Sequence, residues 1–272
     1  MRRIQVAVLH ELTKLGKVYV IGGLVRDLAI YGPDSRPISD IDFVVRCSPA
    51  ALTGFSKRIG ASANRFGGFG VRTDAFKVDF WAFSKTWAKT AGYVPLREPK
   101  DLTRTTFFDW DAVVYGLQEE RVWAIDGYLE RLNSGILGLN LEPNPSPKGS
   151  LVRALRRIMA WDVKPAPRLR HFVEEKLAQY DWSEIICAEA HAFATLYLHE
   201  FETAHDYLEF VLRRSKFENL GSHQRRQVSF SEFAGLPNQP YFKKLPQDLS
   251  FRQVPVRKAR KRIKAAEKDL FD

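Results

Sequence analysis

The sequence predicts an α+β fold, in which an N-terminal mixed sheet with flanking helices is followed by a helical region. Before residue 145, short runs of β-branched and aromatic residues alternate with amphipathic helical segments. Three prolines fall within "EPNPSPKGS", residues 142–150, which is typical of a boundary or a rigid connector. After it, helical periodicity dominates. We therefore expect two domains, at residues 1–145 and 146–272.

The first domain is predicted element by element from its periodicity. Ile4, Val8, Leu12 and Leu15 share one face of a helix. The next expected helix begins at Leu24 and ends at Gly32-Pro33. Another begins at the N-cap Ser48, and a short helix covers residues 127–135 and ends at Gly135. The expected strands are "KVYVIGG" (17–23), "DIDFVVR" (40–46), a hairpin within 63–83 that includes "KVDFWAF", and the apolar runs "DAVVYGL" (111–117) and "RVWAIDG" (121–127).

The second domain is expected to be helical. "LVRALRRIMAWDV" (151–163) and residues 188–215 both show helical periodicity. The last stretch is strongly basic, with seven Lys or Arg among the thirteen residues from Arg252 to Lys264. Clustered cations gain affinity for a phosphate backbone by releasing condensed counterions. We expect an RNA-binding arm, or alternatively a solvated helix face; the candidate RNA contacts are Arg257, Lys258, Arg260, Lys261 and Arg262.

Composition and charge limit the class of protein. The 272 residues contain 42 Lys and Arg against 32 Asp and Glu, a formal charge of +10. Such a chain favours anionic partners, although a basic protein without one is the alternative. Apolar runs are shorter than the roughly 18 residues of a membrane span. Two cysteines are too few for a disulfide framework or a cysteine zinc site. We expect a cytoplasmic protein and no membrane.

The candidate site lies in "VIGGLVRDLAIYGPDSRPISDIDFVV", residues 20–45. Gly22 and Gly23 allow the backbone to approach an anion, and Arg26 follows at the start of a helix. Asp40 and Asp42 are two positions apart on a strand, so both point to one face. Two such carboxylates repel each other unless a cation lies between them, and hard oxygen ligands suit Mg²⁺. Asp79, on a later strand, would supply a third carboxylate.

These residues, in this order, resemble the head domain of the class II tRNA nucleotidyltransferase and bacterial poly(A) polymerase superfamily. The family's G-G-x-V-R-D-x-L-x-G motif is matched with one extra residue before the last glycine, and its D-x-D falls on Asp40 and Asp42. Asp79 matches the later acidic position, and "LVRALRRIMA" is similar to the neck motif. The resemblance covers roughly residues 15–165 and implies a nucleotidyltransferase-type sheet. The matching positions in the two motifs are Gly22, Gly23, Val25, Arg26, Asp27, Leu28, Gly32, Arg153, Leu155 and Arg156.

Two departures from the family motifs concern the nucleotide. The R-R-D-F-T-I-N-A motif is replaced by "LTRTTFFDWDAVV", in which one Arg survives as Arg104 and Asp109 or Asp111 would substitute for the displaced acid. In the neck, the Glu-Asp pair falls on Gly149 and Ser150. In the family that Asp and the Arg three residues on recognise the base edge, and only Arg153 remains, so a C-then-A choice does not carry over.

The resemblance implies transfer of a nucleotide from a nucleoside triphosphate to an acceptor hydroxyl, with a two-metal Mg²⁺ site and release of pyrophosphate. Asp40, Asp42 and Asp79 are the expected catalytic carboxylates, with Asp40 and Asp42 as metal ligands. The expected acceptor is an RNA 3′ end, on tRNA, and an oligomer or partner protein would help to hold it. The alternatives are a toxin- or defence-type enzyme that modifies a protein or an unusual RNA, and a non-catalytic binding module. The expected nucleotide contacts are Gly22, Gly23, Arg26, Asp27, Arg104, Asp111, Arg153 and Arg156.

Overall fold

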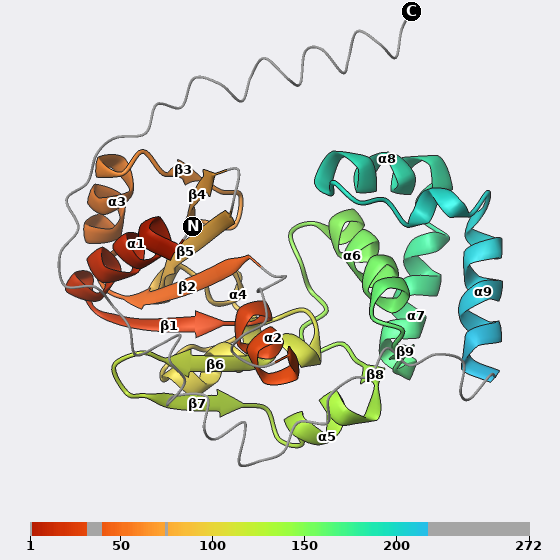
Figure 1. The fold of residues 1–272 in the computed structure, drawn as a ribbon, viewed down its shortest axis with the longest axis horizontal. Helices are drawn as coiled ribbons and strands as arrows, with labels where there is room; N and C mark the ends of the chain where they lie inside the picture. Colours follow the sequence, from red (N-terminus) through yellow and green to blue (C-terminus); the bar gives the residue numbers. More distant parts are fainter. Residues whose placement is uncertain (1, 32–39, 74–75, 217–272) are drawn as a thin grey trace, which may run out of the picture.

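The computed structural model describes residues 2–31, 40–73 and 76–216. Figure 1 shows a sheet with its covering helices on one side and four packed helices, α6 to α9, on the other. This arrangement confirms the predicted α+β class with a helical second part. The predicted RNA contacts between Arg257 and Arg262 lie outside the described residues.

The main sheet has seven strands among the described residues, in the order β3-β4-β5-β2-β1-β6-β7. Only the β2–β5 pair is parallel, and all other neighbours are antiparallel. The strands are β1 (Lys17–Ile21), β2 (Ile41–Arg46), β3 (Ser62–Ala63), β4 (Phe69–Thr73), β5 (Phe76–Ala82), β6 (Val113–Gly116) and β7 (Arg121–Ala124). A separate parallel pair joins β8 (Ile136–Leu137) to β9 (Lys164–Pro165).

Helices cover the sheet and form the second part. The α-helices are α1 (Arg2–Leu15), α2 (Gly23–Tyr31), α3 (Pro49–Arg58), α4 (Trp87–Thr90), α5 (Tyr128–Ser134), α6 (Pro147–Ala160), α7 (Pro167–Leu177), α8 (Trp182–Ala192) and α9 (Ala204–Lys216). The 3₁₀ helices are η1 (Phe83–Lys85), η2 (Pro99–Thr105), η3 (Asp109–Asp111) and η4 (Leu198–Glu200). Ser48 caps α3 as expected, because its Oγ accepts from the Ala51 N–H at 3.2 Å.

Alternation along the central strands separates two apolar clusters, one on each face of the sheet. Phe43 and Val45 of β2 belong to the large core, whereas Val44 between them belongs to a second cluster. β1 and β6 alternate in the same way. The second cluster is closed by residues 83–102, a segment of short helical turns that the periodicity did not predict. Asp42 has the same parity as Val44, so the sheet presents its carboxylates on the face of this second cluster.

The large core continues from the sheet into the helical part. It includes Leu24 of α2, Phe43 of β2, Leu155 of α6 and Leu169 of α7, all nearly inaccessible to solvent. Buried apolar surface therefore joins the two parts on both sides of residue 145. The division at residues 145 and 146 stays a prediction.

The helical periodicity of residues 188–215 is interrupted in the structure. α8 ends at Ala192 and α9 begins at Ala204. Between them the chain turns back on Glu189, whose carboxylate accepts the backbone N–H groups of Tyr197 and Leu198 at 3.0 and 2.9 Å. The fully buried Glu189 carboxylate satisfies two backbone N–H groups between α8 and α9, which explains the break in the helix. Helical periodicity alone does not reveal it.

None of the helices in residues 2–31, 40–73 and 76–216 combines the length and the hydropathy that a bilayer crossing needs.

Candidate active site

Three carboxylates gather where β2 and β5 lie side by side. Asp42 and Asp79 are register partners in this parallel pair, and Asp40 directly precedes β2. Asp79 is nearly buried, Asp42 is partly buried, and the side chain of Asp40 is 53% exposed. Gly70 of β4 is the register partner of Asp79, and a Cβ added at Gly70 would clash with Asp79 Oδ1. The chain thus leaves space for this carboxylate beside the other two.

A lysine lies among these carboxylates. The Lys77 ammonium is 2.7 Å from Asp79 Oδ2 and 3.1 Å from Asp40 Oδ2. Lys77 and Asp79 are two residues apart on β5, so their side chains share a face. Sequence reasoning missed Lys77, although its spacing from Asp79 is the same as that of the two aspartates on β2.

The electrostatics of the three carboxylates favour a cation. Burial, followed by the charge of Asp79, raises the pKa of Asp42 to about 8. Lys77 acts in the opposite direction but does not offset these effects. Within the described residues, no group of three or more His, Cys, Asp or Glu is arranged to hold a metal ion. By donor chemistry the set nevertheless fits Mg²⁺, because it consists of hard carboxylate oxygens with unbalanced negative charge.

The glycine turn leads from β1 into α2 beside this cluster. Gly22 has φ +71°, a left-handed conformation that favours glycine, and its N–H donates to Val113 O at 3.0 Å. Ile21, the last residue of β1, is the register partner of Asp42. The predicted turn, Gly23 at the start of α2 and the carboxylates are therefore brought together at one end of the sheet.

Arg26 and Asp27 of α2 are buried beneath this turn and pair with each other. Arg26 Nη2 is 2.6 Å from Asp27 Oδ1, and Arg26 Nη1 also contacts Asp111. The guanidinium packs 4.3 Å from the ring centroid of Trp161, and only 2% of the Arg26 side chain is exposed. From its place at the start of a helix, we expected Arg26 to be open to a ligand. In the structure its guanidinium is buried and pairs with Asp27 and Asp111.

Asp111 joins the sheet part to helix α6. Its second oxygen accepts from Arg157 Nη1 at 2.5 Å, so one carboxylate bridges Arg26 and Arg157. Arg157 also lies 4.5 Å from the Trp161 ring, which stacks on Trp110 at 5.7 Å. Although burial opposes it, Arg157 and Arg26 lower the pKa of Asp111, whereas burial lowers that of Arg157 to about 10.

Arg153 lies one turn before Arg157 on the same face of α6. Its Nη2 donates to Ser150 Oγ at 3.0 Å, and the guanidinium packs 5.9 Å from the Phe107 ring centroid. Burial lowers the pKa of Arg153, while Asp111 and Asp42 act to raise it. The charge of Arg153 is therefore favoured by Asp111 and, to a smaller extent, by Asp42 of the carboxylate cluster.

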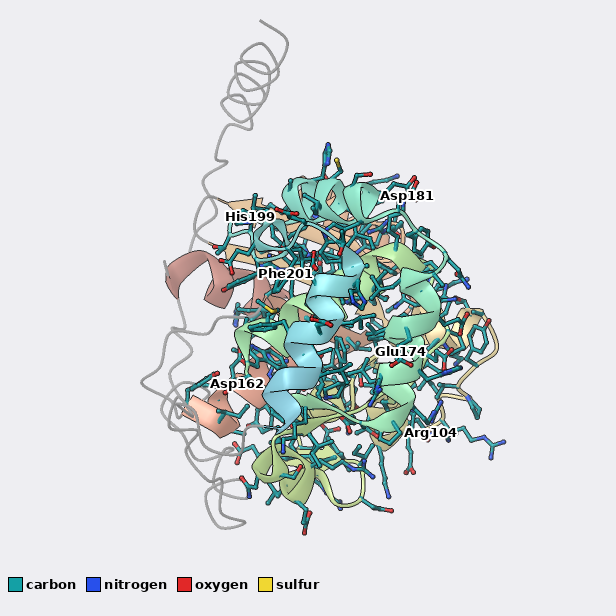
Figure 2. The ribbon with its side chains drawn as sticks, turned by 90° about the vertical axis from the view of Figure 1, so that its right-hand side faces the viewer. Arg104, Asp162, Glu174, Asp181, His199 and Phe201 are labelled. Atoms are coloured by element: carbon teal, nitrogen blue, oxygen red, sulfur yellow. The ribbon has the colours of Figure 1, made fainter. Side chains whose placement is uncertain are left out.

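Other predicted residues lie apart from this cluster. Arg156 points into the helical part, where it pairs with buried Glu189 and packs on Phe193. Arg104 is exposed on η2, at the edge of the molecule in Figure 2. Asp109 accepts the Gly138 N–H at 2.9 Å and pairs with Arg131, so it stabilises a loop. Of the two acids named as substitutes in the family motif, Asp111 is the one that contacts α2.

Two further functional candidates, Arg157 and Trp161, were not identified from the sequence. The signal for Arg157 was present in the helical period, because positions 153 and 157 are one turn apart on the same face of a helix. No local pattern distinguishes Trp161 from the other five tryptophans of the chain. Its contacts with Arg26 and Trp110 join segments 50 or more residues apart, which no local pattern predicts.

Comparison with solved structures supports this fold. A structure described as "tRNA-processing enzyme (apo form I)" superposes with a TM-score of 0.50 and 18% identity, covering 79% of this chain and 57% of the other. A "CCA-adding enzyme with ATP" superposes with a TM-score of 0.50 and 16% identity, covering 79% and 51%.

The chain thus spans little more than half the length of these proteins. No family model and no curated protein matches the sequence. At such low identity the likeness concerns the fold, and it confirms the resemblance noted from the motifs: this chain has the nucleotidyltransferase fold of the class II tRNA nucleotidyltransferase head domain.

Proposed function

We propose that this protein is a Mg²⁺-dependent nucleotidyltransferase that transfers a nucleoside monophosphate from a nucleoside triphosphate to an acceptor hydroxyl. The observation that supports this most directly is the in-register pair Asp42 and Asp79, with Asp40 beside them. A binding module without catalysis would not need three carboxylates held together against their repulsion.

In this proposal Asp40, Asp42 and Asp79 hold Mg²⁺, which would stabilise the attacking and leaving oxygens of an in-line displacement. The acceptor oxygen forms a bond to the α-phosphorus, the bond from that phosphorus to the bridging oxygen breaks, and pyrophosphate leaves. The hydroxyl proton passes to solvent or to a carboxylate oxygen. In the same proposal the start of α2 after the Gly22 turn would lie beside the triphosphate, and Arg153 of α6 would offer a cation.

We propose an RNA 3′ end as the acceptor, as on tRNA. The excess positive charge of the chain favours a polyanion. The two superposed proteins are a tRNA-processing and a CCA-adding enzyme, and the second was solved with ATP, which agrees with a triphosphate substrate. The helical part, α6 to α9, and the basic tail would then hold the RNA.

Base choice is proposed to differ from that of CCA-adding enzymes. Ser150 stands at the neck position of the family's Asp and is fully buried, with its hydroxyl accepting from Arg153. A guanidinium has donors and no acceptor, so the pair cannot match a base edge as an Asp and an Arg do.

The test is a transfer assay with purified protein, Mg²⁺, each labelled nucleoside triphosphate in turn, and total RNA beside total protein as acceptors. Label in RNA, lost in Asp42→Asn and in EDTA, supports the proposal. Label in protein alone would support the alternative acceptor, and no label in either pool would contradict a transferase.

A further inference from the structure

The four side chains at the carboxylate cluster form a square on two neighbouring strands. The β2–β5 register pairs Ile41 with Val78 and Asp42 with Asp79, so Asp40 lies next to Lys77. Lys77 contacts Asp40 across the strands at 3.1 Å and Asp79 along β5 at 2.7 Å. Asp42 occupies the opposite corner. One ammonium group thus contacts two of the three carboxylates and offsets one of their negative charges.

We propose that Lys77 is a built-in counterion that competes with the divalent metal ion for Asp40 and Asp79. This inference rests on the proposed function, since it concerns the same three carboxylates. A metal ion that uses all three carboxylates would share Asp40 and Asp79 with the ammonium group. Repulsion between the two cations at this short range opposes metal binding and favours movement of the ammonium away from Asp79. Lys77 thereby lowers the affinity of the site for metal and keeps the metal-free sheet from carrying adjacent unpaired charges.

The partial exposure of Lys77 suits this role. Its side chain is 31% exposed, so the ammonium has a path to solvent when it leaves Asp79, and the flexible four-carbon stem allows the movement. Once displaced, it remains beside the triphosphate and adds a positive charge there. Lys77 is thus a positioning residue, which acts through the carboxylates.

The experiment measures Mn²⁺ binding by the full chain, without nucleotide, from the electron paramagnetic resonance signal of free Mn²⁺. Lys77→Met is expected to bind Mn²⁺ roughly tenfold more tightly than the wild type, a change of about 1.4 kcal/mol. In EDTA this variant should melt at a lower temperature than the wild type, and saturating Mn²⁺ should raise its melting temperature by more.

Arg72→Met is the matched control. Arg72 is the register partner of Lys77 on β4 and is exposed, so the substitution removes one positive charge from the same face. It should change Mn²⁺ affinity by no more than about twofold, as expected for a screened surface charge. Lys77→Arg keeps the charge and should stay close to the wild type, which provides a second variant if the methionine variant folds poorly.

Equal Mn²⁺ affinity in Lys77→Met and wild type, or equal gains in Lys77→Met and Arg72→Met, would overturn the inference. The proposed function is tested separately, because Asp42→Asn should weaken Mn²⁺ binding and abolish transfer whatever Lys77 does. If Lys77→Met binds Mn²⁺ more tightly but the wild type transfers no nucleotide, the counterion role stands and the proposed reaction fails.

Discussion

Asp42 is the residue on which the negative charges of the site converge. Burial raises the pKa of Asp42, and the charges of Asp79, Asp40 and Asp111 act in the same direction. Asp42→Asn should abolish nucleotide transfer, yet leave the metal-free fold equally stable or more stable by on the order of 1 kcal/mol, because it relieves like-charge repulsion. Transfer assays and urea unfolding in EDTA measure the two effects.

Asp126→Asn is the control for this substitution, since Asp126 is exposed on the chain after β7. It should alter neither transfer nor stability. Full activity in an Asp40→Asn, Asp42→Asn double variant would contradict the assignment of these residues as metal ligands.

Arg153 of helix α6 donates to Ser150 and forms no ion pair with a carboxylate among the described residues. Burial lowers its pKa, whereas the charges of Asp111 and Asp42 act to raise it. Arg153→Ala should change the ratio of kcat/KM between nucleoside triphosphates by roughly tenfold or more, since hydrogen bonds to a charged group contribute about 1.5–3 kcal/mol. Arg156→Ala, beside it on α6, should leave this ratio unchanged, because Arg156 contacts Glu189.

Steady-state kinetics with single nucleotides measure that ratio. A strict C-C-A product from the wild-type protein would show that the departure at Ser150 does not alter base choice.

At the scale of elements, Asp111 and Trp161 join helix α6 to the sheet part. Asp111 bridges Arg26 of α2 and Arg157 of α6, and Trp161, next to the end of α6, stacks against Trp110. Both interactions tie α6, the helix that carries Arg153, to the sheet part. We therefore expect α6 and the site to form one rigid unit.

Asp111→Asn tests this joint. The substitution leaves buried Arg26 and partly buried Arg157 without their shared anion and should lower the free energy of unfolding by about 3–5 kcal/mol. Glu142→Gln removes one negative charge from an exposed ion pair 3.9 Å long and should cost less than about 0.5 kcal/mol. Urea denaturation followed by tryptophan fluorescence distinguishes them, and a loss as small as that of Glu142→Gln would refute the joint.

At the scale of the whole molecule, the charge distribution predicts how RNA binds. Arg257, Lys258, Arg260, Lys261 and Arg262 lie outside the described residues, and their role stays a prediction. Replacing all five with Gln should weaken binding to unrelated RNAs about equally. It should also flatten the salt dependence, by roughly 0.7–0.9 in log–log slope for each lost phosphate contact.

Filter binding or fluorescence anisotropy over roughly 50–200 mM salt measures this effect. Transfer to a short acceptor that does not reach the tail should survive the five substitutions. Unchanged affinity with an unchanged slope would instead identify the tail as a solvated segment.

The local patterns predicted most strands and helices of the first part and the candidate carboxylates. Alternating β-branched runs predicted β1, β2 and β5 to β7, and the glycine turn with three aspartates predicted the site, because strand parity places i and i+2 on one face. The break between α8 and α9 and the turns that cover the second cluster were not predicted, since buried Glu189 and the apolar face of the sheet decide them.

Only the tertiary structure decided which charges meet. The sequence by itself shows Arg26, Arg153 and Arg156 as cations near a nucleotide motif. In the fold, Arg26 pairs with Asp27 and Asp111, and Arg156 pairs with Glu189. Arg153 instead donates to Ser150, and the charges of Asp111 and Asp42 act to raise its pKa. Lys77 enters the site through strand pairing with the segment before β2, a contact between residues 37 positions apart. Propensity and periodicity act over a few residues, whereas the pairing of buried charges depends on strand register and helix docking across the whole chain.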